Sequence, residues 1–556
     1  MNARSAKQAM MEQLLAEGVR YVFGNPGTTE QPFIDLLQDY PQIEFILALQ
    51  ESVAVGMADA YARVTGRPAF VELHAAPGLG NAMGLLYNVW KGGTPLVVYA
   101  GQQDSRALLQ EPLLAGDLVG LARPFTKWAV EVTHGADVPF ALRRAFKVAM
   151  DPPRGPVFVS IPMDVLDQPA PGPVIPAGRT LARVGPDPDA VAQAAALLAG
   201  AQAPAIVCGD GVAVAGAQAE VARLAELAGA PIFTAVASEV VVDTRHPLFL
   251  GAFPVASIPR LREALAHVDV LLVVGAAVFT QLIPEPEPLV PESVRLIHVH
   301  LNPWELGKNY RTDVAVLADP KRALAELAAA LERTQTPAQR AAAEARATAV
   351  AERRRQARAA LARELERVRD QAPIAPLRLM QAIAEHLPSG ACVYDESVTA
   401  SEALARCLSV SEPGSYLRAR GGGLGLGMPG TVGLKLARPD RPVVGVVADG
   451  AAMYTIQALW TAAHHKVPVT WVICNNRSYR ILKLNMLQYL GEAAAGRRFV
   501  AMDLTEPDLD FARIAASFGV QGERVEHPDQ LAPALRRAFA AGVPALVDVV
   551  IDGTVP

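Results

Sequence analysis

The sequence predicts an α/β protein built from three doubly wound parallel-sheet domains. Short, fully apolar segments alternate with helical segments along most of the chain, and such strands are typical of parallel sheets covered by helices on both faces. The chain has 556 residues, 51% of them hydrophobic and 19% charged, which is enough for several cores and too much for one. Its 43 glycines and 44 prolines favour tight loops between many short elements rather than disorder.

The first domain is predicted over residues 1–170. Its N-terminal segment reads as an amphipathic helix without the apolar core of a signal peptide, and another helix is expected from Glu51 to about Thr65. The strand candidates are VRYVFG, IEFILAL, PAFVELHA, PLVVYAG and GPVFVSIP. A proline-rich segment, PAPGPVIPAG (169–178), then indicates a linker.

A central domain is predicted over residues 185–333, with strands near PAIVCGDG, APIFTAV, VDVLLVVGA and VRLIHVHL. It ends near the helix KRALAELAAALER. Residues 334–372 are dense in Ala, Arg and Glu and indicate a solvated helical connector, in which we interpret Arg353–Arg355 as a charged helix face.

The third domain is predicted over residues 373–556. Its strand candidates are ACVYDES, RPVVGVVADG, VPVTWVICNN and PALVDVVI. These strands again alternate with helical segments, so the first and third domains look like one architecture used twice.

Composition excludes several classes of protein. The net charge of −5 and the pI of 6.1 give no sign of a basic nucleic-acid surface. The longest apolar run, Val268–Phe279, is too short to span a bilayer. The cysteines form no CxxC pair, so a zinc site or a disulfide framework is not expected and a reducing cytoplasm is the simplest location. The four cysteines are Cys208, Cys392, Cys407 and Cys474.

Two polar pairs follow neighbouring apolar strands of the third domain. One strand ends at Asp449-Gly450, a helix follows, and the next strand ends at Asn475-Asn476. Ligands of open parallel sheets bind beyond the carboxyl ends of the strands. A carboxylate and an amide oxygen suit Mg²⁺, which usually takes its remaining ligands from phosphates and water. The helix start near Ala451 to Tyr454 offers free N–H groups to an anion. Although Asp-Gly alone is common in turns, the whole layout predicts a metal-bridged diphosphate.

The segment 443–479 resembles the thiamine-diphosphate signature, GDG followed by NN, with Ala448 in place of the first glycine. We expect this small change at a strand end to be tolerated. The resemblance implies that Asp449, the side chain of Asn476 and the backbone carbonyl of Ser478 bind the metal. Further implied cofactor contacts are Gly450, Ala451 and Tyr479.

Thiamine chemistry needs a carbanion at C2 of the thiazolium ring, and the cofactor supplies its own base if a carboxylic group hydrogen-bonds its aminopyrimidine. Glu51 follows the strand IEFILAL and opens a helix. By itself it could be a first-turn glutamate favoured by the helix dipole. However, IEFILALQESVAVGMADAYAR resembles the glutamate-bearing helix of thiamine-diphosphate decarboxylases and acetohydroxyacid synthases, which implies that Glu51 is the activating residue.

The glycine-rich segment GGGLGLGMPG (421–430) resembles the loop that bends this cofactor. The resemblance implies that Gly422 offers a backbone carbonyl to the aminopyrimidine and that Leu424 is the wedge beneath it. A glycine-rich loop alone could be a turn, but its place between DES (395–397) and ADG supports the assignment. The cofactor-binding set that the resemblance implies is completed by Pro26, Asn81 and Thr399.

Glu51 lies in the predicted pyrimidine-binding domain and Asp449 in the predicted diphosphate-binding domain, so one cofactor must bridge the two. In this superfamily the bridge crosses between subunits. A homo-oligomer with its active site at the subunit interface is therefore implied, at least a dimer and commonly a homotetramer.

Nearly the whole chain resembles the benzoylformate decarboxylase family. The matching segments are FGNPGTTEQPF (23–33), LALQE (47–51), LHAAPGLGNAMG (73–84) and GQQ (101–103). The resemblance implies non-oxidative decarboxylation of a 2-oxo acid through a carbanion/enamine intermediate. It makes His74 the residue that transfers protons. It also places Thr28 where the family has a serine that meets the substrate carboxylate, and the extra methyl group should narrow the pocket.

The chain departs from that family around the substrate. The family's second catalytic histidine is missing, because Leu282 in TQLIPEPE stands about where it would be. In RSYRILKLNML (477–487), Ile481, Leu482 and Asn485 should line a differently shaped pocket. We interpret His464 and His465 as surface residues.

Slow late protonation would let an aldehyde or a second oxo acid capture the intermediate. We therefore expect that carboligation rivals or exceeds simple decarboxylation.

Two alternatives remain. An acetohydroxyacid-synthase-like carboligase usually binds FAD through an arginine near a GxRF-type segment, and Ala277 in GAAVF replaces that arginine, so FAD is not expected. A non-catalytic cofactor-binding protein is disfavoured by the intact Glu51, His74, Asp449 and Asn476. An oxidoreductase is weaker still, because no GxGxxG follows a strand with an acidic partner downstream.

Overall fold

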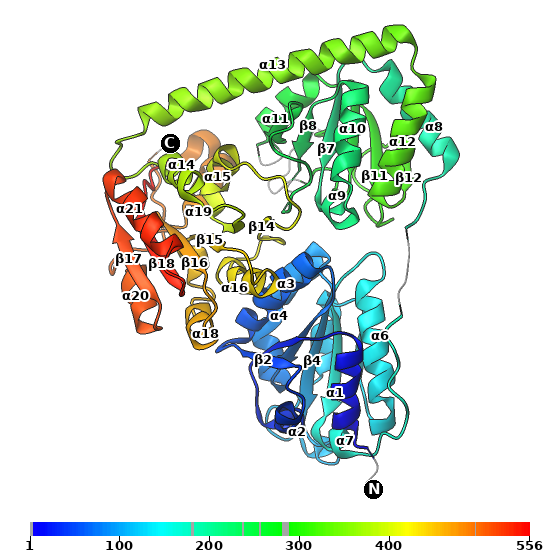
Figure 1. Ribbon diagram of the computed structural model, residues 1–556, viewed down its shortest axis with the longest axis vertical. Coiled ribbons are helices and arrows are strands. Elements are labelled where there is room, and N and C mark those ends of the chain that lie inside the picture. The colour runs from blue at the N-terminus through cyan, green and yellow to red at the C-terminus, as the bar shows by residue number, and fades with distance from the viewer. Residues whose placement is uncertain are drawn as a thin grey trace.

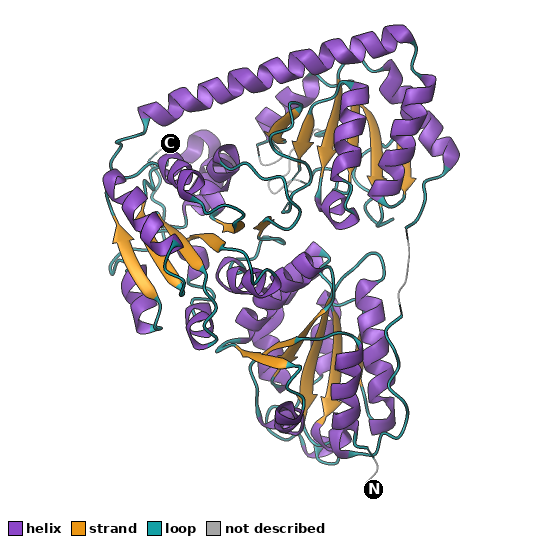
Figure 2. Ribbon diagram, in the orientation of Figure 1, coloured by secondary structure: helices purple, strands orange, loops and turns teal. Residues whose placement is uncertain are grey.

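The computed structural model of this chain describes residues 4–178, 183–235, 238–254, 257–280, 288–494 and 496–555. Each of three domains holds one six-stranded parallel sheet with helices packed on its faces (Figures 1 and 2). The predicted fold class is therefore confirmed. Among the helices of these residues, none is both long enough and apolar enough to cross a membrane.

The N-terminal sheet has the strand order β2-β1-β3-β4-β6-β5. All residues of β1, β3, β4 and β6 are buried, as expected for strands covered on both faces. Its strands are β1 (Tyr21–Gly24), β2 (Glu44–Leu47), β3 (Ala69–Leu73), β4 (Leu96–Gln102), β5 (Ala129–Glu131) and β6 (Val157–Pro162). Its longer helices are α1 (Ala6–Ala16), α3 (Glu51–Thr65), α4 (Ala75–Gly92) and α6 (Val138–Met150).

The central sheet has the order β12-β11-β10-β7-β8-β9, which is the doubly wound order of dinucleotide-binding folds when counted from its own first strand. Its strands are β7 (Pro204–Cys208), β8 (Ile232–Thr234), β9 (Phe249–Ala252), β10 (Val270–Val274), β11 (Arg295–His300) and β12 (Val314–Leu317). Its helices are α8 (Pro188–Gly200), α9 (Asp210–Ala215), α10 (Gln218–Ala228), α11 (Ile258–Ala266) and α12 (Pro320–Thr334).

The predicted connector is a single helix, α13 (Pro337–Arg367), which runs from the central domain to the C-terminal domain (Figure 1). A capping box of Thr336 and Gln339 starts it. Its Arg353–Arg355 run is not entirely a solvated face, which corrects the prediction. Arg354 turns inward, because its guanidinium donates hydrogen bonds to the backbone carbonyls of Thr244 and of Phe249, which lies on the edge strand β9.

The C-terminal sheet has the order β14-β13-β15-β16-β18-β17. Counted from the first strand of each sheet, this is the order of the N-terminal sheet, so the prediction of one architecture used twice is confirmed. Its strands are β13 (Cys392–Glu396), β14 (Tyr416–Arg418), β15 (Val443–Ala448), β16 (Thr470–Asn475), β17 (Gln521–Val525) and β18 (Ala545–Val550). Its helices are α14 (Pro376–His386), α15 (Ser401–Cys407), α16 (Gly427–Ala437), α17 (Asp449–Ala452), α18 (Ala458–His464), α19 (Arg480–Leu490), α20 (Phe511–Ser517) and α21 (Pro528–Phe539).

The N- and C-terminal domains share one hydrophobic core through α3 and α16. The two helices approach so closely that a Cβ atom at Gly433 would lie 2.0 Å from the Met57 carbonyl oxygen. Likewise, a Cβ atom at Gly56 would lie 2.5 Å from Pro429 Cγ. Glycine is therefore required at both crossing points.

A second contact joins α18 to β2. His465 Nε2 accepts a 2.9 Å hydrogen bond from Leu47 N, and Thr461 Oγ1 donates to the Leu47 carbonyl at 3.0 Å. Burial and the neighbouring His464 lower the pKa of His465 to about 4, so its ring is neutral and can accept. His464 is exposed as predicted, but the surface assignment of His465 is wrong because it pairs the two domains.

Candidate active site

Glu51 stands in the first turn of α3, directly after β2, as predicted. The Gln50 side-chain oxygen caps this helix by accepting hydrogen bonds from Ser52 N at 2.6 Å and Val53 N at 3.3 Å. Glu51 is 7% exposed, and Asn81 Nδ2 donates a 3.0 Å hydrogen bond to its Oε2. The structure thus brings these two predicted cofactor residues together. Within the described chain no residue hydrogen-bonds Glu51 Oε1, which leaves that atom for a ligand.

His74 follows β3 and precedes the first residue of α4. Its Nδ1 lies 2.8 Å from Glu30 Oε2 and 3.3 Å from Thr29 Oγ1. Glu30 is fully buried and also accepts hydrogen bonds from Gly101 N at 2.8 Å and Gly27 N at 3.1 Å. Because a carboxylate accepts the Nδ1 proton, Nε2 is the ring nitrogen left for chemistry.

No role for Glu30 was predicted from the sequence, although this residue lies within the FGNPGTTEQPF segment. A signal was available there: a glutamate two residues after Thr28 in a loop that follows an apolar strand. Its partner His74 is 44 positions away, so the pair itself is visible only in the fold.

The loop that carries Pro26 and Thr28 packs against His74. A Cβ atom at Gly27 would lie 2.1 Å from His74 Nδ1, so the loop runs directly over the ring. Pro26 and Thr28 themselves are exposed on this chain. The residue after the histidine, Ala75, has a φ of +45°, a strained value for alanine that is often found at functional sites.

Asp449 directly follows β15 and is 1% exposed. Its Oδ1 accepts a 2.7 Å hydrogen bond from Gly450 N, whereas its buried Oδ2 has no hydrogen-bond partner among the described residues. Burial raises the pKa of Asp449 to about 6, and backbone N–H groups of Gly450 and residues 476–478 oppose that rise. The loop after β16 therefore lies against the carboxylate. A buried, unpartnered carboxylate oxygen fits a bound cation.

The loop after β16 supplies further oxygens. Asn476 Oδ1 accepts hydrogen bonds from Ser478 N at 3.0 Å and Ser478 Oγ at 3.1 Å. Gly450 faces the Tyr479 ring, where a Cβ atom would lie 2.6 Å from Cε1. Carboxylate, amide and backbone carbonyl oxygens are the hard ligands that Mg²⁺ accepts, so the residues present suit this metal.

The helix expected after Asp449 is only four residues long. Met453 N bonds the Asp449 carbonyl at 3.4 Å and Tyr454 N bonds the Ala451 carbonyl at 3.2 Å. The expectation of free N–H groups as far as Tyr454 is therefore wrong, because the chain turns there and uses them itself.

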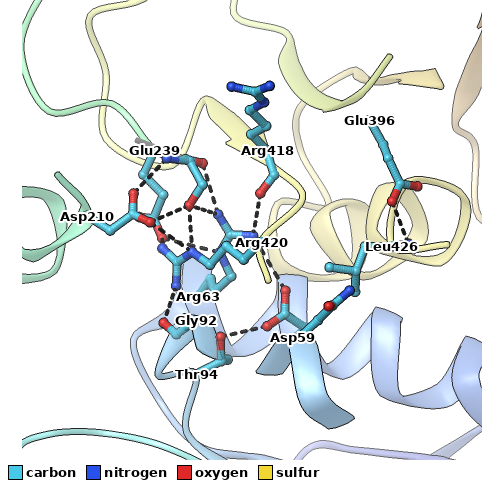
Figure 3. A network of polar contacts seen from close by, with 12 residues as sticks. Asp59, Arg63, Gly92, Thr94, Asp210, Glu239, Glu396, Arg418, Arg420 and Leu426 are labelled. Carbon is cyan, nitrogen blue, oxygen red and sulfur yellow. Dashed lines mark hydrogen bonds and ion pairs between the residues drawn. The ribbon is translucent and has the colours of Figure 1, made fainter. Parts of the chain in front are cut away.

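The glycine-rich loop runs from β14 to α16 and is fixed at its exit by Glu396, at the end of β13. The buried Glu396 carboxylate accepts hydrogen bonds from Gly425 N at 3.0 Å, Leu426 N at 3.2 Å and Gly427 N at 2.6 Å, and Figure 3 shows the one from Leu426. Burial raises the pKa of Glu396 to about 7, although these three donors oppose the rise. The wedge candidate Leu424 is thus held just before an anchored segment. No anchoring role for Glu396 was predicted from the sequence, where it was noted only as part of the DES segment (395–397).

Thr399 lies half-buried in the short 3-10 helix that follows β13. Its neighbour Val398 has a φ of +52°, which is an outlier for a β-branched residue. Strain of this kind beside a predicted cofactor contact is consistent with a functional role for the turn.

The predicted pocket residues Ile481, Leu482 and Asn485 lie on α19, which has no buried residue in this chain. Leu482 is 45% exposed. The helix is held by Tyr479 N on the Met502 carbonyl at 2.8 Å and by an ion pair of Lys483 with Asp503. Leu282 lies outside the described residues.

A buried ionic network joins all three domains (Figure 3). Arg63 of α3 lies 3.3 Å from Glu239 and 3.5 Å from Asp59 and donates to the Ser238 carbonyl at 2.9 Å. Arg420 pairs with Asp210 at 3.2 Å and with Glu239. Sequence reasoning missed this network because its members are spread over the whole chain.

The Glu51–His74 group and the Asp449–Asn476 group belong to different domains. No hydrogen bond or ion pair between described residues joins one group to the other. Exposed apolar side chains lie next to each group: Leu49 (45%), two residues before Glu51; Leu114 (42%), whose carbonyl accepts a hydrogen bond from Ala76 N; and Met453 (38%) and Tyr454 (55%), which follow Asp449.

Comparisons with known families match three consecutive segments of the chain. Residues 4–118 match "Thiamine pyrophosphate enzyme, N-terminal TPP binding domain". Residues 191–327 match "Thiamine pyrophosphate enzyme, central domain", and residues 397–549 match "Thiamine pyrophosphate enzyme, C-terminal TPP binding domain".

Similar proteins cover almost the whole chain. It is 36% identical to benzoylformate decarboxylase of Pseudomonas aeruginosa over 98% of each chain. It is 29% identical to an acetolactate synthase large subunit of Parasynechococcus marenigrum, over 98% of this chain and 87% of that protein. The solved structure of thiamine diphosphate-dependent 4-hydroxybenzoylformate decarboxylase from Rhodococcus jostii superposes with a TM-score of 0.85 at 32% identity, covering 99% of both chains.

Proposed function

Since this chain belongs to the thiamine pyrophosphate enzymes, we propose that it catalyses the non-oxidative decarboxylation of a 2-oxo acid. The observation that carries this proposal is the cluster at the carboxyl end of the N-terminal sheet. There a buried carboxylate, Glu51, stands beside a histidine that a second carboxylate, Glu30, holds by Nδ1 at 2.8 Å. One group suits cofactor activation and the other suits proton transfer to the reacting carbon.

Thiamine diphosphate supplies the electron sink that decarboxylation of a 2-oxo acid requires. For the metal we propose Mg²⁺, held by Asp449, the Asn476 side chain and the Ser478 carbonyl. The unpartnered Asp449 Oδ2 supports this assignment. Further proposed contacts to the cofactor come from Pro26, Asn81, Thr399, Gly450, Ala451 and Tyr479.

The chain's own residues then have separate tasks. Glu51 hydrogen-bonds the aminopyrimidine through its free Oε1, while Asn81 holds its Oε2 at 3.0 Å. Gly422 would offer its backbone carbonyl to the same ring, and Leu424 would support the cofactor. Glu51, Asn81 and Leu424 act through their side chains, so their roles can be tested by substitution. Gly422 acts through its backbone carbonyl.

His74 and Thr28 face the substrate in this proposal. Glu30 fixes the His74 tautomer, so that Nε2 gives and takes the proton. The Thr28 hydroxyl meets the substrate carboxylate, and the Thr28 methyl narrows the pocket relative to a serine. Ile481, Leu482 and Asn485 on α19 complete the pocket wall.

We further propose that the active site forms between two copies of the chain, in a homodimer or a homotetramer. The exposed apolar residues beside both half-sites support this arrangement, since such surfaces mark contacts between proteins. Sedimentation of the purified protein should give at least twice the mass of the chain, which is 58.9 kDa.

The function is tested by supplying the purified protein with thiamine diphosphate, Mg²⁺ and single 2-oxo acids with aryl, branched or short side chains. CO₂ release and the aldehyde product are measured for each acid, with Glu51→Gln protein as the background. We expect release with at least one acid. A protein that binds the cofactor but releases no CO₂ from any acid contradicts the proposal.

Carboligation is the second candidate activity. It is favoured by Leu282, which stands about where the related decarboxylases carry a second histidine. It is also favoured by the acetolactate synthase among the similar proteins. Pyruvate or benzoylformate, incubated with and without an acceptor aldehyde, should yield a 2-hydroxy ketone when the acceptor is present. Free aldehyde alone in both cases would exclude it.

FAD is not part of the proposed holoenzyme, because Ala277 replaces the arginine of the related FAD-binding segment. The purified protein should therefore be colourless, with no absorbance near 450 nm.

A further inference from the structure

A buried asparagine of the N-terminal domain hydrogen-bonds the glycine-rich loop of the C-terminal domain. Asn88 lies on α4 and is 1% exposed. Its Nδ2 donates to the Gly423 carbonyl at 2.7 Å, and its Oδ1 accepts from Gly423 N at 3.0 Å. One side-chain amide therefore satisfies both backbone groups of one residue, as a neighbouring strand would.

The residues on either side of Gly422 pack closely against Asn88. At Gly421, whose φ is +80°, a Cβ atom would lie 2.7 Å from Asn88 Cα. At Gly423 it would lie 2.8 Å from Asn88 Oδ1. Gly422 itself has a φ of +92° and open space around it, and no hydrogen bond from a described residue reaches its carbonyl. Asn88 thus hydrogen-bonds Gly423 and packs against Gly421, the two neighbours of Gly422, whose own carbonyl accepts no hydrogen bond from a described residue.

Two other contacts hold the ends of this loop but not its centre. Arg420, directly before Gly421, donates to the Gly92 carbonyl at the end of α4 at 2.9 Å (Figure 3). Glu396 holds residues 425–427. Among hydrogen bonds between described residues, only those of Asn88 reach residues 421–423.

From this geometry we infer that Asn88 is a positioning residue, which sets the Gly422 carbonyl for the aminopyrimidine of thiamine diphosphate. The inference rests on the proposed role of Gly422. It also gives α4 a double task, because the same helix carries Asn81, which bonds Glu51 at 3.0 Å, two turns before Asn88. Without the amide the loop keeps both anchored ends and loses the fixed orientation of its centre.

The test compares Asn88→Leu, which keeps the volume and removes both hydrogen bonds, with wild type as dialysed apoprotein. Thiamine diphosphate is titrated with excess Mg²⁺ and binding is followed by tryptophan fluorescence. Two lost hydrogen bonds should raise the apparent Kd by about tenfold or more. Hydrogen exchange of residues 421–424 in the apoprotein should also become faster. Asn88→Ala provides a second variant that introduces no new atoms, in case leucine prevents folding.

Thr94→Val is the matched control. Thr94 is 1% exposed, follows the same helix, and donates a 2.6 Å hydrogen bond to Asp59 Oδ1, whereas no hydrogen bond between described residues joins Thr94 to residues 421–424. It should lower the Tm to a similar extent and leave the Kd for the cofactor within about twofold.

An unchanged Kd in both Asn88 variants, or an equal rise in Thr94→Val, overturns the inference. Failure of the proposed function would look different, since the wild-type protein would then bind no thiamine diphosphate or release no CO₂.

Discussion

The N- and C-terminal domains place different chemistry at equivalent positions of one topology. Glu51 follows the second strand of the first sheet, and the Gly421–Leu424 loop follows the second strand of the last sheet. His74 follows the third strand of the first sheet and Asp449 the third strand of the last. The shared topology therefore defines where functional side chains leave the sheet. The residue type at each position would then decide between proton transfer and the binding of a diphosphate with its metal, as proposed for the two domains.

The equivalence extends to packing. The helices that follow the second strands, α3 and α16, are the pair that pack against each other, with glycines at both crossing points. The contact between the domains is thus made by equivalent helices. Substitutions at matched positions should therefore disturb different steps while perturbing the fold to a similar extent.

The largest effect is expected at Glu51. Glu51→Gln keeps the volume but cannot act as the carboxylic partner of the cofactor, so kcat should fall by about a thousandfold or more. Binding of thiamine diphosphate should largely survive. Steady-state CO₂ release and a cofactor titration on the same preparation check both statements. Persistent activity would remove Glu51 from its assigned role.

Asp449→Ala, in the C-terminal domain, should lose cofactor binding, whereas Glu51→Gln should lose turnover. Removing the carboxylate would eliminate one of the proposed metal ligands, so the affinity for Mg²⁺ and for thiamine diphosphate should fall by about a hundredfold. Calorimetric titration of the apoprotein measures both. If cofactor affinity is unchanged while kcat collapses, the division of labour between the domains is wrong.

Glu30→Gln should reduce kcat by about tenfold, because an amide holds the His74 tautomer less firmly than a carboxylate does. KM for the cofactor should not move, since Glu30 acts through His74. Ser105→Ala, which removes an exposed hydrogen bond to Asp164 in the same domain, serves as the control and should be neutral. Equal losses in both variants would point to folding rather than to the histidine.

The smallest effect concerns Glu72, two residues before His74 and fully buried, with neither carboxylate oxygen hydrogen-bonded. Burial, with the nearby Glu30 and Glu51, raises the pKa of Glu72 well above its ordinary value of 4.5. As the pH rises past 4.5, the unfolded chain releases a proton that the folded chain keeps, so the folded state loses stability. The equivalent residue before Asp449 is the apolar Val447.

Glu72→Leu should therefore raise stability by about 1–3 kcal/mol at pH 8 and by less at pH 5. Thermal unfolding at the two pH values measures this. The reciprocal Val447→Glu should be destabilising, and more so at pH 8. A gain in Glu72→Leu that is the same at both pH values would mean that the carboxylate charge is not its origin.

The interior strands were predictable from sequence, and most sheet edges were not. The strands β5, β9, β12, β14 and β17 were not predicted, and all five lie at a sheet edge. Their residues are partly exposed, as in β12, where buried and exposed positions alternate. The strands β9 (FLGA) and β12 (VAVL) are apolar but only four residues long, and β5, β14 and β17 contain charged residues, so none shows a long apolar run. Among edge strands only β2 was found, because Phe45–Leu47 sits in a longer apolar segment.

Within the site, residues at strand ends were predictable because motif and strand pattern agree there. Glu51 with Asn81, and Asp449 with the loop after β16, are brought together as expected. Residues that act on those groups were missed, namely Glu30, Glu396 and Asn88. Each has partners that are distant in sequence, and spacing carries no information about such contacts.

The network around Arg63 and Arg420 has a consequence for recombination between related genes. The two arginines come from the outer domains and both pair with Glu239 of the central domain, where Arg420 also pairs with Asp210. A chimera that exchanges only the central segment keeps these ion pairs only if the donor brings both acids; otherwise Arg420 loses both acid partners and Arg63 keeps only Asp59 of its own domain. Viable crossovers between divergent parents should therefore keep these four residues as one inherited block.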